Sequence, residues 1–556
     1  MPAPQPPAHL PAPDNSKLRR TWDRVVWGGL LAWTFLSLCY PLYDTDFWWH
    51  LKTGEWIVEK RSIPQVDLYT FTEQETPWID LHWGFQLLIT GLYHLGGVNL
   101  VILVKALIIT AAVAVGWLAG GRALPVWLKV ALWIPAVICI SGRGYERPEM
   151  LSQLFLAGWL WMVRHVEERP RLIWFLPVLQ VLWVNCHALF VLGLVVGACF
   201  VVDCLLRDFA QGRWGLERGT RQPSAQVIVR VGVLVAVACL VNPYFEEGAL
   251  FPLTLYRKFT VEQDFYSAHI GEFFRPVDHV IRRGPSALAS IYLLSEIAVW
   301  CIAVASFVWL LWRRGRWSPL RVLLFAGFSH LAWEATRNTN IFSIVSSYVA
   351  CENFADALPE QKSAPAAQPG LRGSWVISGV LVSLIVAVVS GVWAEIGEPN
   401  KAFGLGEARN WFIHEAARFA GKQGFPRRAF LAHNGQAAVY AYHNAPERLV
   451  FMDARLEVCS RATFEEFNRI LAAMARGDPR WQELFLQNKG ELPVVILDSR
   501  ISRPQINGMF FTPDWRLVFA DRTAAVFLPN ELADKLSLSQ ADPTPLKYPD
   551  GPPREP

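Results

Sequence analysis

Long apolar runs separated by short basic loops make up most of the chain up to Ile396. A membrane-spanning helix needs about 20 mostly apolar residues, within a range of about 17 to 25. On that criterion the pattern predicts a polytopic, mainly α-helical transmembrane bundle with about eleven spans. The expected spans lie at residues 25–43, 98–118, 126–141, 149–164, 171–186, 187–206, 227–241, 287–312, 319–334, 339–351 and 375–394.

The segment 81–95 is apolar along one face only and ends at Gly96-Gly97. If this segment lies in the membrane interface without crossing, the arginine-rich loops 164–171, 207–230 and 313–321 all fall on one side. Arg19 and Arg20, before the first span, fall on that side too. Because basic loops face the cytoplasm, we expect the N-terminus to be cytoplasmic and the C-terminal part to be extracytoplasmic.

The composition supports this interpretation. Of 556 residues, 53% are hydrophobic and 18% are charged, as is typical of multi-span membrane proteins. The net charge of +4 is small and spread over several loops, so nucleic acid is not expected as a partner. The proline-rich ends, residues 1–20 and 539–556, are expected to be disordered.

Beyond the transmembrane part, residues 21–396, the chain has the pattern of a soluble α/β domain at residues 397–538. Helices are expected at 406–422 and 463–476. The sequence also predicts short strands at residues 429–433, 437–443, 448–453, 493–498, 516–521 and 524–529.

The loop that follows the first span carries an unusual mixture of acids, histidines and tryptophans. The tryptophan rings are expected at the level of the lipid head groups. We expect this outer loop, residues 44–97, to form two juxtamembrane helices. Asp44-Thr45-Asp46 opens it, and either carboxylate could take a proton from an attacking group; a solvated helix cap is the alternative. His50 and His82 follow, and Asp46 with His50 could hold a divalent cation, although plain hydrogen-bonding histidines remain open.

Other polar groups at span ends are expected on the same outer face. An arginine at a span end could bind a phosphate, because its planar guanidinium binds two oxygens. The alternative for such an arginine is an ion pair with a neighbouring acid or with a lipid head group. Histidine or glutamate at a span end could contact substrate or serve as interhelix hydrogen-bonding groups. Collected on one face, these residues indicate a shared polar cavity; they are Arg143, Arg147, His187, Glu272 and Arg337.

The motifs in these segments resemble those of the GT-C superfamily of polytopic glycosyltransferases, including its protein mannosyltransferase and aminoarabinose transferase branches. The most similar group is a set of uncharacterised bacterial membrane proteins within that superfamily. The shared motifs are DTDFWWHLKTGEWI at 44–57, PWIDLHW at 77–83, RGYERPE at 143–149, WVNCH at 183–187, NPY at 242–244 and DAR at 453–455.

The resemblance implies a bacterial inner-membrane enzyme that uses a lipid-linked, polyprenyl-phosphate sugar at the periplasmic face, with direct, inverting displacement. It implies that Asp44 or Asp46 is the catalytic acid and that arginines bind the donor phosphate. The acceptor, whether glycan, lipid or protein, stays open. A transporter or flippase for lipid-linked precursors is the alternative, and a non-catalytic assembly protein is a third.

Overall fold

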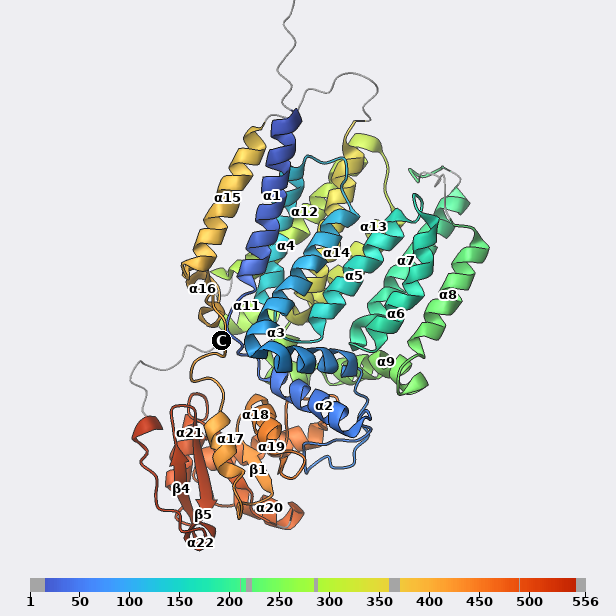
Figure 1. Cartoon of the computed structure of the whole chain (residues 1–556). Coiled ribbons are helices and arrows are strands. Elements are labelled where there is room, and N and C mark those ends of the chain that lie inside the picture. The colour runs from blue at the N-terminus through green and yellow to red at the C-terminus, as the bar shows by residue number, and fades with distance from the viewer. Residues whose placement is uncertain are drawn as a thin grey trace, which may run out of the picture.

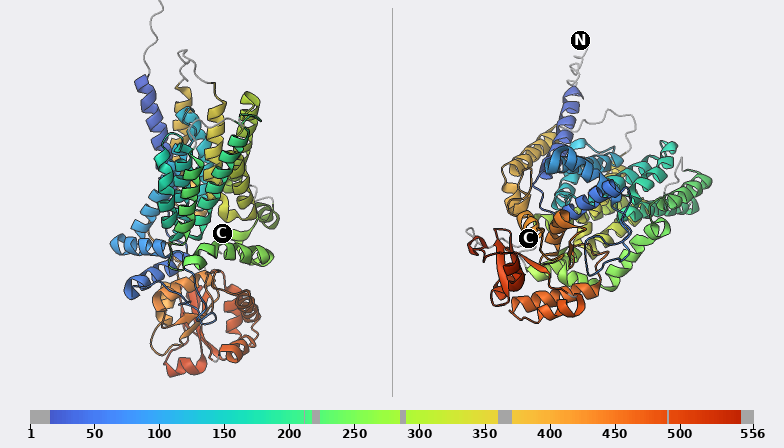
Figure 2. Two further views of the ribbon diagram at one scale, coloured as in Figure 1. Left: turned by 90° about the vertical axis from the view of Figure 1, so that its right-hand side faces the viewer. Right: turned by 60° about the horizontal axis from the view of Figure 1, so that its bottom comes forward.

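The computed structural model describes residues 16–210, 212–216, 223–284, 289–359, 371–489 and 491–546. Long helices run side by side and form a bundle, and a small domain that contains the only sheet of these residues lies at one end of it (Figures 1 and 2). The N-terminal end of the first helix lies at the opposite end of the bundle (Figure 1).

Helices of the bundle and of its connecting loops extend to Ile396. They are α1 (Ser16–Ser37), α2 (Asp46–Lys60), α3 (Trp83–Ala119), α4 (Val126–Gly142), α5 (Glu149–His165), η1 (Pro170–Phe175), α6 (Leu176–Val184), η2 (Ala188–Phe190), α7 (Val191–Ala210), α8 (Ala225–Cys239), α9 (Phe245–Val261), α10 (Gln263–His269), η3 (Gly271–Phe273), α11 (Pro276–Arg283), α12 (Ile291–Arg314), α13 (Pro319–Glu334), η5 (Thr336–Asn338), α14 (Thr339–Ala357), α15 (Arg372–Val389) and α16 (Val392–Ile396).

The helices follow the predicted spans, although α14 continues to Ala357, α15 ends at Val389 and α1 is shifted furthest. α1 begins at Ser16 and ends at Ser37, so both of its ends lie earlier than expected. The helix ends before Pro41 because proline lacks the backbone N–H that a helix interior needs. α3 is broken at Gly96 and Gly97, where the φ of Gly97 is 64°. The break confirms that the helix preceding these glycines differs in direction from the span that follows, and Figure 1 shows the first half lying across the bundle end.

Several helices are suited to a membrane. By length and composition, the described residues contain 4 helices able to cross one: α3, Ala188–Ala210, α12 and α15. Shorter apolar helices occur at Val126–Gly142, Pro170–Val184 and Ala225–Cys239. Exposed valines and leucines cover the outward faces of these helices, among them Val202, Val229, Val233, Val308, Val382 and Val386. Such a continuous apolar surface is the signature of contact with lipid.

The C-terminal domain has a five-stranded sheet in the order β2-β1-β3-β5-β4. β1, β2 and β3 are parallel, and β5 is antiparallel to both β3 and β4. The elements are η6 (Pro399–Lys401), α17 (His414–Ala420), β1 (Arg428–Leu431), α18 (Asn434–Asn444), β2 (Leu449–Val450), α19 (Arg461–Ala475), α20 (Trp481–Lys489), β3 (Val494–Asp498), α21 (Arg503–Phe510), β4 (Trp515–Ala520), β5 (Ala524–Pro529), α22 (Asn530–Lys535) and η7 (Thr544–Leu546).

Two sequence predictions for this domain were wrong. The strand expected at 437–443 is α18, because the His433 side chain caps a helix there by accepting the Gln436 N–H, and buried alanines form the packing face. The helix expected at 406–422 is confined to α17. The part of the C-terminal tail beyond residue 546 lies outside the described residues.

The outer loop joins the domain to the bundle. Thr70 forms a parallel bridge with Val450 at the β2 edge, and the Val450 N–H donates to the Tyr69 carbonyl at 2.8 Å. Thr72 Oγ1 donates to the Phe451 carbonyl at 2.5 Å. The outer loop therefore pairs with the exposed edge of β2 and extends the sheet on that side.

This contact changes the expected environment of the loop tryptophans. We expected them among lipid head groups, but Trp48, Trp49 and Trp78 are each at most 5% exposed. Trp48 packs in edge contact with Phe412 and His414 of the domain. Removing these indole rings from water against a second domain stabilises the docked arrangement.

Candidate active site

The arginine-bearing turn between α4 and α5, residues 142–147, is held from three sides. Lys401 Nζ donates to the Gly142 carbonyl, and the Tyr40 hydroxyl donates to the Gly144 carbonyl at 2.6 Å. Glu146 forms a buried ion pair with Lys105 of α3, with 2.7 Å between Oε1 and Nζ. These contacts fix the backbone from which Arg143 and Arg147 project.

Arg147 links three carboxylates from distant parts of the chain. Its Nη2 lies 3.0 Å from Asp44 Oδ1 and 3.0 Å from Asp46 Oδ2, and its Nε donates to Asp44 Oδ2. Its Nη1 lies 3.1 Å from Glu272 Oε1. Arg143 adds a second cation, with Nη2 at 3.4 Å from Glu272 Oε1. The structure thus brings five of the predicted site residues into one ion network.

Asp46 and Glu272, two of the three acids in this network, have pKa values shifted in opposite directions. Burial raises the pKa of Asp46 to about 7, because it outweighs the attraction of Arg147, and the charges of Asp44 and Glu272 add to the rise. Burial alone would also raise the pKa of Glu272, but Arg147, Arg143 and Arg337 together lower it to about 2. A carboxyl that titrates near neutral pH is suited to proton transfer, whereas one that stays ionised is suited to holding cations.

Asp44 has a positioning role, because it binds both Arg147 and the backbone of Asp46. Its side chain is 3% exposed, compared with 19% for Asp46. Its Oδ1 accepts the Asp46 N–H at 3.1 Å, so it orients the turn as well as Arg147. Asp46 also provides a negative charge in the first turn of α2, where the helix dipole favours one. The more accessible carboxylate is therefore Asp46.

The three predicted histidines form a row, with His82 between His50 and His187. The ring centroid of His82 lies 5.5 Å from that of His50 and 5.6 Å from that of His187. Asp80 lies 3.3 Å from His82 Nδ1 and helps to raise the pKa of that ring, whose burial alone would lower it. Burial lowers the pKa of His50 well below its usual range. His187 Nδ1 shares a 2.8 Å hydrogen bond with the Ser152 hydroxyl.

The two residues predicted as metal ligands, Asp46 and His50, contact other groups in the structure. Among the described residues, no group of three or more histidine, cysteine, aspartate or glutamate side chains could hold a metal ion. Asp46 instead pairs with Arg147, and the ring of His50 stacks against Trp49 with 3.6 Å between centroids.

Arg337 lies beside the network without joining it. Its guanidinium carbon is 5.1 Å from the ring centroid of Phe273, next to Glu272. Its charge contributes to the low pKa of Glu272. Arg337 is therefore close enough to act on an anion in the same space, at longer range than Arg143 and Arg147.

Sequence reasoning missed the strongest contact between the domain and the outer loop. Arg455 is fully buried, with Nη2 at 2.5 Å from Asp67 Oδ1 and 2.7 Å from Asp453 Oδ2. Its guanidinium carbon also lies 4.5 Å from the ring centroids of Tyr69 and of Trp78. The sequence places Asp453 and Arg455 in one short motif, and that motif indicates nothing about Asp67.

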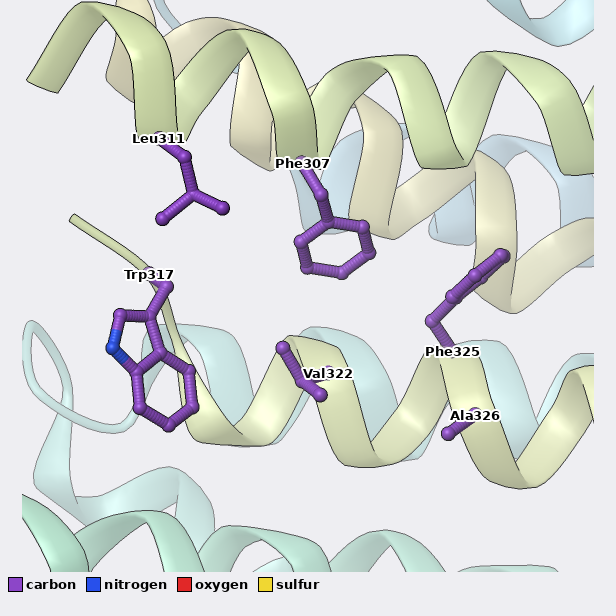
Figure 3. A pocket seen from close by; sticks show the side chains of 6 residues that line it. All are labelled: Phe307, Leu311, Trp317, Val322, Phe325 and Ala326. Atoms are coloured by element: carbon purple, nitrogen blue, oxygen red, sulfur yellow. The ribbon is translucent and has the colours of Figure 1, made fainter. Parts of the chain in front are cut away.

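One apolar cavity contains none of these site residues. It has a volume of about 430 Å³ and lies between α12 and α13, where its lining side chains point toward one another (Figure 3). The lining residues are Phe307, Leu311, Trp317, Val322, Phe325 and Ala326. With no charged group among them, the cavity offers no acid, base or phosphate ligand.

Comparison with solved structures identifies the fold. The Archaeoglobus fulgidus oligosaccharyltransferase tethered to an acceptor peptide containing the NVT sequon has a TM-score of 0.53 at 10% identity, over 93% of this chain and 75% of that one. The archaeal oligosaccharyltransferase AglB from the same organism, in complex with an inhibitory peptide and a dolichol-phosphate, has a TM-score of 0.53 at 9% identity, over 88% and 71%. The chain has the GT-C fold.

A third structure, ArnT from Cupriavidus metallidurans, aligns over 92% of this chain and 98% of its own at 12% identity, with a TM-score of 0.39. No protein-family model matches the sequence. No curated protein matches it either.

Proposed function

We propose that this chain is a membrane glycosyltransferase. In this proposal it transfers a sugar from a polyprenyl-phosphate-linked donor to an acceptor at the periplasmic face of a bacterial inner membrane. The GT-C fold supports the class of enzyme. The observation that carries the proposal is the ion network in which Asp44, Asp46 and Glu272 share Arg147. The two aspartates lie in the loop that follows the first helix.

Asp46 is the proposed general base. Its pKa near 7 means that a large fraction is ionised at neutral pH and can accept a proton from the acceptor hydroxyl or amide. The acceptor oxygen or nitrogen attacks the anomeric carbon as the bond to the phosphate oxygen breaks. The electron pair of that bond leaves with the lipid phosphate, and the configuration at the anomeric carbon inverts.

Arg143 and Arg147 are the proposed phosphate ligands, and Arg337 acts at longer range. Stabilising the leaving phosphate electrostatically is usually a large part of such catalysis. Arg147 already binds three carboxylates, so a donor phosphate would take over part of its hydrogen bonding. Glu272, whose pKa is about 2, stays ionised and keeps both arginines in position during that exchange. His50, His82 and His187 would line the space for the sugar or the acceptor.

The proposed orientation rests on charge. Figure 1 shows the end of the bundle remote from the C-terminal domain, where α5 and α12 end and α13 begins. Arg164 and Arg313 lie in the last turns of α5 and α12, Arg321 lies in the first turn of α13, and Arg122 lies between α3 and α4. Basic residues concentrate on the cytoplasmic side of membrane proteins. The ion network and the domain would then lie on the periplasmic side.

The test is donor consumption by purified protein in detergent, with a panel of radiolabelled polyprenyl-phosphate sugars. We expect the wild type to release or transfer sugar from one donor and the Asp46→Asn variant to lose that turnover. Asp264→Asn is the matched control, because Asp264 is an exposed acid of α10. Loss of turnover in the control as well, or full turnover in Asp46→Asn, would remove the assigned role.

A further inference from the structure

A cavity lined in part by cationic side chains lies at the end of the bundle remote from the ion network. It occupies about 370 Å³ between the end of α3, the start of α4 and the end of α5. Its lining includes two tryptophans and three cationic residues: Trp117, Trp161, Arg122, Lys129 and Arg169. None of these residues belongs to the site described above.

Lys129 is the central feature of this cavity. Only 4% of the residue is exposed, and its ammonium lies 3.8 Å from the ring centroid of Trp117. Among the described residues, no carboxylate lies within ion-pair distance of it. A buried ammonium without a counter-charge costs free energy, and a ring face offsets only part of that cost. The cavity therefore contains a cation that is suited to an anionic ligand.

The nearest buried acid is already neutralised. Glu352 accepts from Arg164 Nε at 2.5 Å and from the Gly121 N–H at 2.7 Å, and Arg321 lies 3.5 Å from it. At the rim, Arg122 pairs with Glu168 at 2.6 Å. Arg169 is exposed and forms no ion pair within the described part of the chain. Lys129 and Arg169 thus line one cavity with two positive charges that have no carboxylate partner in the described part of the chain.

The rest of the lining is apolar and reaches the outer surface of the bundle. Leu118 lines the cavity and is 49% exposed, and the neighbouring Trp117 and Trp161 rings suit the depth of lipid head groups. A ligand with a phosphate and an attached apolar chain could contact the cations and the exposed leucine together. Basic pockets between helices on the cytoplasmic side have this composition where they bind lipid head groups.

We propose that this cavity binds a phosphate group, presented by an anionic phospholipid of the cytoplasmic leaflet. The phosphate oxygens accept from Lys129 and Arg169, and the first methylenes of the lipid lie along Trp117 and Leu118. This site is separate from the proposed donor site and does not depend on the glycosyltransferase assignment.

Native mass spectrometry of the full-length protein in detergent tests the proposal. The probes are phosphatidylglycerol, phosphatidylcholine and inorganic phosphate. We expect phosphatidylglycerol to bind more tightly than phosphatidylcholine, and Lys129→Met and Arg169→Gln each to weaken phosphatidylglycerol binding about fivefold. The matched control is Arg313→Gln, an exposed arginine at the same end of the bundle and outside the cavity, which should leave binding unchanged.

The competition with inorganic phosphate and the comparison of the two lipids identify the ligand of this cavity. If inorganic phosphate alone displaces phosphatidylglycerol from the wild type and not from the two variants, the phosphate site stands and its ligand is a soluble phosphate. Equal binding of both lipids, or equal binding by wild type, Lys129→Met and Arg169→Gln, would overturn the proposal. Arg169→Gln changes an exposed rim residue, so the test holds even if Lys129→Met fails to fold.

Discussion

The buried arginine between the domain and the outer loop allows a quantitative test of how the two parts are held together. In an Arg455→Met variant, the carboxylates of Asp67 and Asp453 lose a shared cation that lies at 2.5 and 2.7 Å from them. The replacement side chain fills part of the volume but offers no donor. Both acids are then buried without their counter-charge, because Asp67 is 6% exposed and Asp453 is 1% exposed.

The expected cost follows from that burial. Removing one partner of a buried ion pair costs about 3–5 kcal/mol. Since about 1.4 kcal/mol changes an equilibrium constant tenfold, the loop should separate from the domain about 10²- to 4 × 10³-fold more often. The contact most directly affected is the hydrogen bond from the Val450 N–H to the Tyr69 carbonyl.

Hydrogen–deuterium exchange of peptides covering residues 66–72 and 449–452 measures this opening. We expect exchange there to accelerate by the factor given above, with membrane helices unaffected. Arg461→Met is the control, because the Arg461–Glu465 pair is half-exposed and such surface pairs contribute about 0–1 kcal/mol. Acceleration of less than about threefold in Arg455→Met, within the range expected for that control, would refute the reasoning.

Three further outcomes are expected. Burial raises the pKa of Asp46 to about 7, and a general base must be ionised to act. Turnover should therefore rise about tenfold per pH unit below that value and level off above it. A flat profile of initial rates between about pH 5 and 8 would contradict this role. Arg147→Lys cannot bridge three carboxylates with a compact ammonium, so the KM for the donor should rise about 10- to 100-fold, and unchanged kinetics would remove its phosphate role. Glu146→Gln leaves Lys105 buried and unpaired, which should destabilise the protein by about 3–5 kcal/mol in thermal melts, whereas a Lys105→Met/Glu146→Met double variant should recover stability.

Most of the helical architecture could be predicted from the sequence, because hydrophobic periodicity and helix breakers are local signals. Gly96-Gly97 separated an interfacial helix from a span, and the structure breaks α3 at those residues. The strand prediction at 437–443 failed because its alternation of small and aromatic residues also suits a buried helix face. There the cap provided by His433 decides the outcome.

The candidate site could be predicted only in part. Charges at span ends indicated that Asp44, Asp46 and Arg147 lie on one face. The contact between Arg147 and Glu272 joins residues 125 positions apart, and no pattern along the chain specifies such a pairing. The burial of the loop tryptophans was also missed, because a ring suited to the head-group region is equally suited to an interface with a second domain.

The central claim is that the chain catalyses sugar transfer at Asp46, and the most direct measurement compares donor binding with donor turnover in the same proteoliposomes. We predict that wild type and Asp46→Asn bind the same polyprenyl-phosphate sugar, and that only the wild type releases its lipid phosphate. Binding by both proteins with no turnover of any donor by the wild type would contradict the claim and favour a transporter of lipid-linked precursors.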